Sequence, residues 1–325
     1  MTIFKIEQHK YHTTYNILGI KLNIKKSDTE QIKLKNKEEY LLCKNMSEAE
    51  YPEYLKKWFF EKTGDSLDLD NPKTFNEKIQ WLKLYDRNPL KTKLADKYEV
   101  RDWIKEKIGE EYLIPLLGVW DNFEDIDFDD LPNKFVLKCN HGCHQHFLVK
   151  NKNEFDKSFA KEKFNEWMNK NWAYCAGLEL HYKDIKPRIL AEKFIESRYG
   201  LTDYKLWCFD GQVKYIQYIS ERDKYGEYKM AFFDREWKKQ DFISNYVIID
   251  EEIKKPDNLD KLIEIAEILA KDFQFVRVDL YILDNGDIKF GEMTFTPGSG
   301  VLNWQPKSQN MEIGKILNIG INFKK

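Results

Sequence analysis

The chain alternates between segments whose apolar residues recur at every second position and segments with helical spacing. Residues 17–24 belong to the first kind, with Ile20, Leu22 and Ile24 on one face, and this alternation predicts a short strand or hairpin. Residues 26–40 are polar and rich in lysine, and we expect them to form a linker. The first 40 residues therefore form a small β element and its connection to the rest of the chain.

Helical spacing dominates from about residue 41 to residue 107. Within this region the segment TFNEKIQWLKLYDR places four apolar residues on one helix face, and Thr74 or Asn76 is suited to cap its first turn. The four apolar residues are Phe75, Ile79, Leu82 and Tyr85. A second helix, roughly Lys93 to Lys107, is expected after Asn88-Pro89.

Strands and helices alternate in the next part of the chain. FVLK (135–138) and HFLVK (146–150) are predicted strands that flank a short loop. Residues 152–172 have helical spacing, and RILAEKFIE (188–196) is predicted to begin as a strand. In that strand Glu192 shares a face with apolar residues, so its carboxylate needs a partner, which is either a ligand or a nearby lysine.

The C-terminal third has the pattern of two hairpins separated by a helix. The runs 203–209 and 212–219 flank the tight turn Asp210-Gly211. Residues 258–271 are amphipathic at helical spacing, and a second hairpin follows them. Taken together, the pattern predicts an α+β protein in which helices cover antiparallel sheets.

The second hairpin carries the strongest chemical signal. If Asn285-Gly286 forms a two-residue turn, Asp279 lies directly opposite Glu292 on one face of the hairpin. Two carboxylates so placed, with Cβ atoms about 4.5–5.5 Å apart, destabilise a sheet unless something neutralises them. A hard divalent cation would do so, particularly Mg²⁺ completed by substrate phosphates. The alternative is a surface hairpin whose carboxylates point into water.

Neighbouring residues extend this signal. Arg277 falls opposite Thr294, one pair further along the same face, where it could meet a transferring phosphoryl group. The segment TPGSG (296–300) follows at once, and such a glycine-rich turn allows the backbone to approach a ligand closely. The hairpin and the turn together predict a phosphate- and metal-binding site.

Composition narrows the class of protein. The 325 residues are 42% hydrophobic and 33% charged, with a formal net charge of only −2, so no overall field favours nucleic acid or an anionic membrane. Five scattered cysteines suggest no disulfide framework and fit a reducing compartment. The Walker A, GxGxxG and GxSxG motifs are absent from the sequence, which argues against the mechanisms that depend on them.

The N-terminus lacks the apolar core of a signal peptide, and no apolar run reaches the roughly 18 residues of a membrane span. We therefore expect a cytoplasmic protein without a transmembrane segment, with loose peripheral attachment to a membrane complex left open.

Several of these segments together resemble one known family. The run from TFNEKIQWLKLYDRNPL through ADKY, LPNKFVLKCNHG, KPRILAEKFIE, DYKLWCFDG and FVRVDLY to GEMTFTPGSG is similar to the TupA-like family of ATP-grasp proteins, over about residues 55–310. Proteins of this family occur with bacterial capsule, teichuronopeptide and O-antigen biosynthesis. The resemblance implies an ATP-grasp fold, with two α+β lobes that clasp ATP.

The resemblance also assigns the metal and phosphoryl-contacting residues. By its motif Asp279 and Glu292 are the magnesium ligands, with Mn²⁺ as a substitute for Mg²⁺. Thr294 stands where the family usually has a third ligand, an asparagine, and Pro297-Gly298 matches the turn that follows. Lys205 and Arg277 would meet the phosphoryl oxygens or an acyl phosphate.

The nucleotide contacts follow from the same resemblance. Lys138 and Lys97 match the two lysines that meet the phosphates of ATP. Glu192 would accept a hydrogen bond from the adenine amino group, and the backbone of Lys193, Phe194 and Ile195 would contact the ring. Asp203 would approach the ribose.

The resemblance implies a domain layout and an activity. A helical region over 41–110 would precede a core of two lobes, about 111–195 and 196–325. The expected reaction is carboxylate–amine ligation through an acyl phosphate. One substrate would be a uronic acid of a bacterial surface polysaccharide or its precursor, the other an amino acid or amino alcohol, and the enzyme could associate loosely with a polysaccharide assembly complex.

Three alternatives stay open from the sequence. A glycosyltransferase of the same pathway would also use carboxylates, a metal and a diphosphate. The loop CNHGCHQH has fewer glycines than the family's phosphate loop, which would suit a nucleotide-binding pseudoenzyme. The same loop invites a zinc hypothesis through five residues, although their spacing is too tight for paired zinc knuckles. These are Cys139, His141, Cys143, His144 and His146.

Overall fold

The computed structural model describes residues 4–8, 12–17, 20–197, 202–219, 229–244, 247–249 and 251–320. In this part of the chain no helix is both long and apolar enough to cross a membrane.

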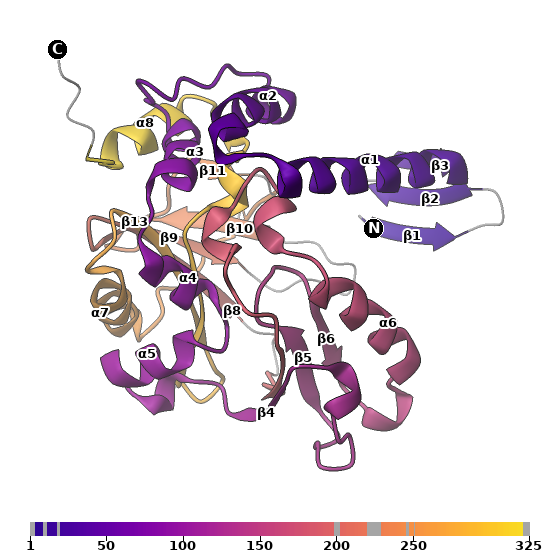
Figure 1. Cartoon of the computed structure of the whole chain (residues 1–325). Coiled ribbons are helices and arrows are strands. Elements are labelled where there is room, and N and C mark those ends of the chain that lie inside the picture. The colour runs from indigo at the N-terminus through magenta and orange to yellow at the C-terminus, as the bar shows by residue number, and fades with distance from the viewer. Residues whose placement is uncertain are drawn as a thin grey trace.

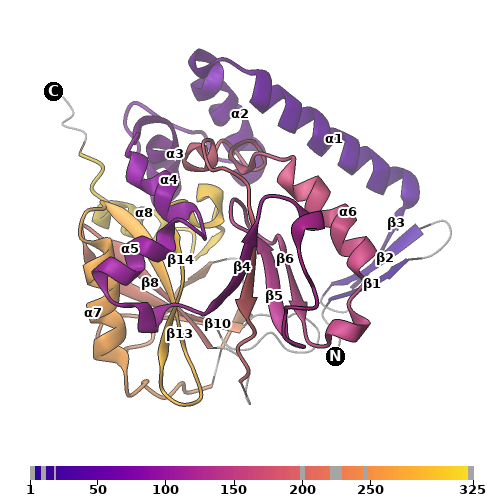
Figure 2. The ribbon, with the colours of Figure 1, turned by 60° about the horizontal axis from the view of Figure 1, so that its bottom comes forward.

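Two sheets with mostly antiparallel strands lie side by side and form the body of the molecule (Figures 1 and 2). The smaller sheet has the order β4-β7-β5-β6 and is antiparallel throughout. Its strands are β4 (Leu116–Trp120), β5 (Phe135–Cys139), β6 (His146–Val149) and β7 (Ile189–Lys193).

The larger sheet has the order β12-β10-β9-β8-β13-β14, and only its β10–β12 pair is parallel. Its strands are β8 (Thr202–Phe209), β9 (Gln212–Ile219), β10 (Lys229–Phe233), β12 (Val247–Ile248), β13 (Phe275–Ile282) and β14 (Ile288–Thr294). A separate short pair joins β11 (Ile243–Ser244) to β15 (Trp304–Gln305).

The larger sheet is buried on both faces, because its strands place apolar side chains on both sides. On β8, Leu206 and Cys208 belong to one apolar cluster with the amphipathic helix α7 (Leu259–Ala270). The alternate residues Trp207 and Phe209 belong to a second cluster, with Phe75 of α3 (Phe75–Tyr85) and with α8 (Gln309–Ile316). The helices thus cover the sheet from opposite sides.

The smaller sheet has its own core beneath α6 (Lys157–Met168). Ala160 and Phe164 of that helix are fully buried against Phe135 and Leu137 of β5. The helix is shorter than the predicted 152–172, because only 3-10 turns flank it, at Lys152–Glu154 and Trp172–Tyr174.

The region before the sheets is helical. Its elements are α1 (Lys26–Asn45), α2 (Tyr51–Thr63), α3 (Phe75–Tyr85), α4 (Pro89–Ala95) and α5 (Val100–Lys107). The predicted linker at 26–40 is wrong, since these residues are part of α1, which projects from the body in Figure 1. At the far end of α1 lies a three-stranded sheet in place of the predicted hairpin. Its strands are β1 (Phe4–Gln8), β2 (His12–Ile17) and β3 (Ile20–Lys25).

Local side chains explain two of the helix boundaries. Thr74 caps α3 in a capping box, in which Glu77 Oε2 accepts from the Thr74 N–H at 2.8 Å and the Thr74 hydroxyl accepts from the Glu77 N–H. The predicted helix over 93–107 is instead broken into α4 and α5. Asp96 at the break turns the chain by accepting from the N–H groups of Tyr98 and Glu99 at 2.7 and 3.2 Å.

The β13–β14 hairpin has the predicted pairing of Asp279 with Glu292, although by a different route. The turn is one residue longer than predicted, since Leu283 N–H donates to Asp287 O at 2.8 Å and Gly286 takes the left-handed conformation. A β-bulge at Gly291 then adds one residue to β14 and restores the register.

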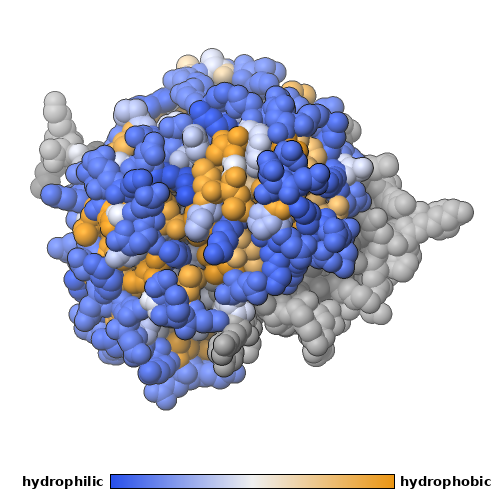
Figure 3. Space-filling view, turned by 90° about the horizontal axis from the view of Figure 1, so that it is seen from below, coloured by the Kyte–Doolittle hydropathy of each residue, from blue (hydrophilic) through white to orange (hydrophobic). Residues whose placement is uncertain are grey.

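The surface is mostly polar, as expected for a chain with one-third charged residues. Seen from below, apolar residues gather near the middle of one face with polar residues around them (Figure 3).

Candidate functional site

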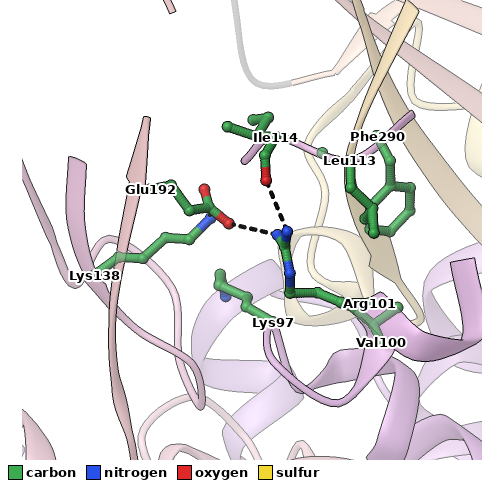
Figure 4. A pocket seen from close by; sticks show the side chains of 9 residues that line it. Lys97, Val100, Arg101, Leu113, Ile114, Lys138, Glu192 and Phe290 are labelled. Atoms are coloured by element: carbon green, nitrogen blue, oxygen red, sulfur yellow. Dashed lines mark hydrogen bonds and ion pairs between the residues drawn. The ribbon is translucent and has the colours of Figure 1, made fainter. Parts of the chain in front are cut away.

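A small pocket lies where three separate regions of the chain meet (Figure 4). The helical region contributes Lys97, Val100 and Arg101, the smaller sheet contributes Lys138 and Glu192, and β14 contributes Phe290 and Gly291. Leu113 and Ile114 complete the lining. Three cations face one carboxylate there, so the pocket carries net positive charge and suits an anionic group.

Glu192 is the centre of this pocket. Its side chain is 5% exposed, and its two oxygens accept from Lys138 Nζ at 2.6 Å and from Arg101 Nη1 at 3.3 Å. The buried carboxylate therefore has cationic partners of its own, and the sequence had left a nearby lysine as one alternative. These ion pairs also fix the direction in which Glu192 faces the pocket.

Arg101 is a site residue that the sequence analysis missed. Its Nη2 donates to the Ile114 carbonyl at 2.8 Å, so the guanidinium ties α5 to the segment that leads into β4. It lies four residues after Lys97 at the start of α5, and this spacing could have drawn attention to it.

Asp96 and Lys97 hold the loop between β5 and β6 against the α4–α5 break. The buried Asp96 accepts from Asn140 Nδ2 at 2.9 Å, and Lys97 Nζ donates to the Gly142 carbonyl at 2.7 Å. Burial raises the pKa of Asp96, and hydrogen bonds from Tyr98 and Asn140 partly offset that effect. These two hydrogen bonds hold the β5–β6 loop, which we expect to bind phosphate, against the α4–α5 break.

The zinc hypothesis for that loop is wrong. Cys139 Sγ contacts Met168 Sδ at 3.9 Å, His141 Nε2 lies 3.1 Å from the Trp167 carbonyl, and Cys143 Sγ contacts the Tyr182 hydroxyl at 3.9 Å. These side chains face different neighbours. No group of three or more His, Cys, Asp or Glu in the described ranges is arranged to hold a metal ion.

A second cluster of charges lies on the larger sheet beside the pocket. Arg277 donates two hydrogen bonds to the Asp279 carboxylate, from Nε at 2.7 Å and from Nη2 at 2.6 Å. Lys205 contacts the same carboxylate. Asp279 is 1% exposed and needs these cations. Burial alone would lower the pKa of Lys205, but the charge of Asp279 contributes to raising it, so the amine is protonated at neutral pH.

Glu292 and Thr294 face the same guanidinium. Arg277 Nη2 donates to Glu292 Oε1 at 3.2 Å and to the Thr294 hydroxyl at 2.9 Å, and this hydroxyl donates to Glu292 at 3.0 Å. The Glu292 side chain is 37% exposed. Burial by itself would raise its pKa, but chiefly the charges of Lys97 and Arg277 hold it at about 2. The charge of Lys97 thus links the two clusters.

Asp203 joins this cluster from β8. Its Oδ2 pairs with Lys205 at 2.6 Å, while its Oδ1 is buried and has no hydrogen-bond partner within the described part of the chain. Burial raises the pKa of Asp203, and the charge of Lys205 lowers it in part. An acceptor left without a donor beside a site expected to bind a sugar hydroxyl is suited to that contact.

Lys193, Phe194 and Ile195, whose backbone is expected to contact the adenine ring, have a simpler environment. Lys193 ends β7 with an exposed side chain, and its N–H donates to the Pro115 carbonyl at 2.9 Å. Phe194 and Ile195 follow the strand and are partly exposed. The structure therefore places these three residues at the carboxyl end of the inner strand β7, directly after Glu192.

The donor set fits a hard cation and a polyphosphate. Asp279, Glu292 and Thr294 offer only oxygen atoms, which Mg²⁺ and Mn²⁺ prefer, and two carboxylates with few protein ligands are typical where substrate phosphates complete the shell. Lys97, Lys138 and Arg277 supply the complementary positive charge. The arrangement suits a phosphate-bearing ligand and a divalent cation where the two sheets meet.

A family comparison gives the same result. A model of the TupA-like ATPgrasp family matches residues 77–318, so the chain belongs to this family. The resemblance seen in the sequence and the α+β ATP-grasp fold that it implied are confirmed. No curated protein matches the chain.

Several solved ligase structures are similar over part of the chain. An L-amino acid ligase from Bacillus licheniformis is 15% identical, with a TM-score of 0.43, and the match covers 70% of this chain and 50% of that one. A D-alanine–D-alanine ligase from Bacillus anthracis complexed with ATP is 18% identical (TM-score 0.37; 62% and 55% covered). An N5-carboxyaminoimidazole synthetase from Staphylococcus aureus is 14% identical (TM-score 0.35; 62% and 44% covered). The chain thus matches only about half the length of these proteins.

Proposed function

We propose that this protein is an ATP- and Mg²⁺-dependent ligase that joins a carboxylate to an amine. The observation that carries the proposal is the direct pairing of Asp279 with Glu292 beside Arg277 and Lys205. This cluster adjoins a cationic pocket that contains Lys138. Membership of the ATP-grasp family supports the same reading.

Each residue has a role in this proposal. Asp279, Glu292 and Thr294 hold the metal, which neutralises phosphate charge when bound. Lys97 and Lys138 bind the phosphates. Glu192 accepts from the adenine amino group, with the backbone of residues 193–195 against the ring, and Asp203 accepts from a ribose hydroxyl. Most of the catalysis is positioning and electrostatic stabilisation, as in phosphoryl transfer generally.

The reaction has two steps. A carboxylate oxygen of the first substrate attacks the γ-phosphorus, the bond to the β-phosphate oxygen breaks, and ADP and an acyl phosphate form. The nitrogen of an amine then attacks the acyl carbon, inorganic phosphate leaves, and the amine gives up a proton to form the amide. Arg277 and Lys205 stabilise the negative charge that develops on the transferring group.

The family context suggests the substrates. We propose a uronic acid of a bacterial surface polysaccharide, or its precursor, as the carboxylate, and an amino acid or amino alcohol as the amine. The reaction would take place in the cytoplasm, where ATP is available, with loose attachment to a polysaccharide assembly complex.

A thermal-shift experiment tests the nucleotide part of the proposal. The melting temperature is measured with ATP–Mg²⁺, ADP, UDP-sugars, and ATP with a chelator. A ligand held at about 100 times its dissociation constant adds about 2.7 kcal/mol to stability, which is readily measured. We expect a magnesium-dependent shift with adenine nucleotides, followed by phosphate release in a screen of acids and amines. A shift only with UDP-sugars would favour a glycosyltransferase, and no shift with any nucleotide would favour a pseudoenzyme.

A further inference from the structure

Two charged side chains are buried outside the site described above. Lys83 of α3 is 4% exposed, and Glu179, which precedes the 3-10 turn Leu180–Tyr182, is 6% exposed. Neither residue lines the pocket around Glu192 or belongs to the cluster of charges around Asp279. Burying both charges costs solvation energy, so their partners indicate what the pair does.

Lys83 connects two turns of unusual backbone geometry. Its Nζ donates to the Ser299 carbonyl at 2.6 Å and to the Gly177 carbonyl at 2.8 Å. Both turns contain left-handed residues, at φ 62° and 60° for Gly177 and Leu178, and at φ 53° for Ser299 between two left-handed glycines. Non-glycine residues adopt this conformation only at a cost, so the surrounding contacts must hold the turns in place.

Glu179 connects the same two regions from the other side. Its Oε2 accepts from Trp172 Nε1 at 3.1 Å, and its Oε1 accepts from the hydroxyl of Thr296. The Trp172 ring lies against Gly142 of the loop between β5 and β6. The two are so close that a Cβ atom added at Gly142 would lie 3.0 Å from the ring. Thr296 lies two residues after Thr294, in the segment that leaves β14.

This pair of buried charged residues therefore contacts both halves of the candidate site. Through Trp172 it supports the loop expected to bind phosphate, and through Thr296 and Ser299 it supports the segment that follows the proposed metal ligands. Burial lowers the pKa of Lys83 to about 7, although the charge of Glu179 raises it in part. Burial likewise raises the pKa of Glu179 while Lys83 lowers it, so each charge depends on the other.

We propose that Lys83 and Glu179 are positioning residues, which set the spacing between the phosphate loop and the metal-binding strand. This inference rests on the proposed function, because the spacing matters only if Mg²⁺–ATP bridges the two elements. The effect of the pair reaches the reaction through Gly142 on one side and through the end of β14 on the other.

The test compares Lys83→Met, Glu179→Gln and the double variant K83M/E179Q with the intact protein. Leu55→Ala is the matched control, because Leu55 of α2 is fully buried in the same apolar cluster as Trp58, whose ring lies under Lys83 Nζ at 4.8 Å. For each protein the dissociation constant for Mg²⁺–ATP, KM and kcat for ATP, and the melting temperature are measured.

We expect each single variant to lose stability and to bind Mg²⁺–ATP at least 10-fold more weakly, with KM rising by the same factor. In the double variant no unpaired buried charge is left, so the melting temperature recovers in part while the weakened nucleotide binding persists. The control L55A loses stability and keeps the nucleotide affinity of the intact protein.

Two results would overturn the inference, and both differ from failure of the proposed function. The first is unchanged affinity in K83M and E179Q. The second is an affinity that follows the melting temperature through all four variants, since the pair would then act on stability alone. If the intact protein itself fails to bind Mg²⁺–ATP, the proposed function fails first.

Discussion

Arg277 donates two hydrogen bonds to Asp279, of 2.7 and 2.6 Å, and the same guanidinium donates a third to Glu292 at 3.2 Å. A cation of the protein thus neutralises the two carboxylates that we propose as metal ligands. A divalent cation bound there would take over this neutralisation, and Arg277 would then have donors available for phosphate oxygens. The two roles proposed for Arg277 are therefore linked.

Removing the carboxylates should abolish turnover. We expect Asp279→Asn or Glu292→Gln to lower ATP-dependent phosphate release by about 100-fold or more, because each loses a ligand to the metal that neutralises phosphate charge. Asp287→Asn is the matched control, since Asp287 is an exposed carboxylate in the turn of the same hairpin. Phosphate release that persists in both variants would exclude the proposed metal site.

Arg101 should matter for nucleotide affinity. In Arg101→Met the Glu192 carboxylate keeps only Lys138 as an ion-pair partner, and the pocket loses one positive charge. We expect ATP to bind about 10-fold more weakly by calorimetry, with Arg101→Lys between the variant and the intact protein. Lys105→Met provides the control, because Lys105 lies on the same helix but pairs with Glu110 at the exposed surface. Equal affinities of R101M and the intact protein would contradict the role.

The bulge at Gly291 should be sensitive to a single methyl group. A Cβ atom there would lie 3.0 Å from Tyr281 Cε2 and 3.1 Å from the Asp279 carbonyl, so Gly291→Ala pushes on the strand that carries Asp279. We expect a loss of about 1–3 kcal/mol in unfolding free energy by urea titration, together with a fall in turnover. Gly286→Ala strains the turn of the same hairpin at φ 86° and should reduce stability while turnover is kept. A G291A protein with full turnover would show that the bulge does not set the geometry of the site.

The same bulge shows where the sequence was sufficient and where it was not. Strand alternation and the Asn285-Gly286 turn led to the pairing of Asp279 with Glu292, which the structure contains. The route was wrong in two places, since a longer turn and an extra residue in β14 cancel each other. A glycine inside a strand, such as Gly291, can mark a bulge, but the sequence alone does not determine whether one forms, because that depends on packing between strands.

Contacts between distant segments were beyond the sequence for a similar reason. Lys83 and Glu179 lie in segments whose polar residues looked like ordinary helix and loop positions, and only the fold brings them together. The break at Asp96 was missed because a side chain, and not a proline or glycine, turns the chain. In contrast, the capping of α3 by Thr74 was predictable, since it depends on four consecutive residues.

The partly buried His181 should make stability depend on pH on the acid side. Burial lowers its pKa to about 3, with the charges of Lys91 and Lys83 acting in the same direction. As pH falls from about 6.5 towards 3, the unfolded chain binds a proton that the folded protein does not, so stability is lost by up to about 1.4 kcal/mol per pH unit. Urea unfolding at several pH values should show a shallower slope over this range in His181→Asn. An identical slope in the variant would show that His181 does not contribute.

The pocket around Glu192 is lined by residues of the helical region before the lobes, of the smaller sheet and of β14. During synthesis the nascent chain therefore carries Lys97 and Arg101 long before Phe290 and Gly291 leave the ribosome. The hairpins β8–β9 and β13–β14 join neighbouring segments and can form quickly, but the pocket requires contacts between distant segments, which form slowly. The complete pocket consequently forms late in folding, and binding of the proposed nucleotide would report that the chain is folded from α5 to β14.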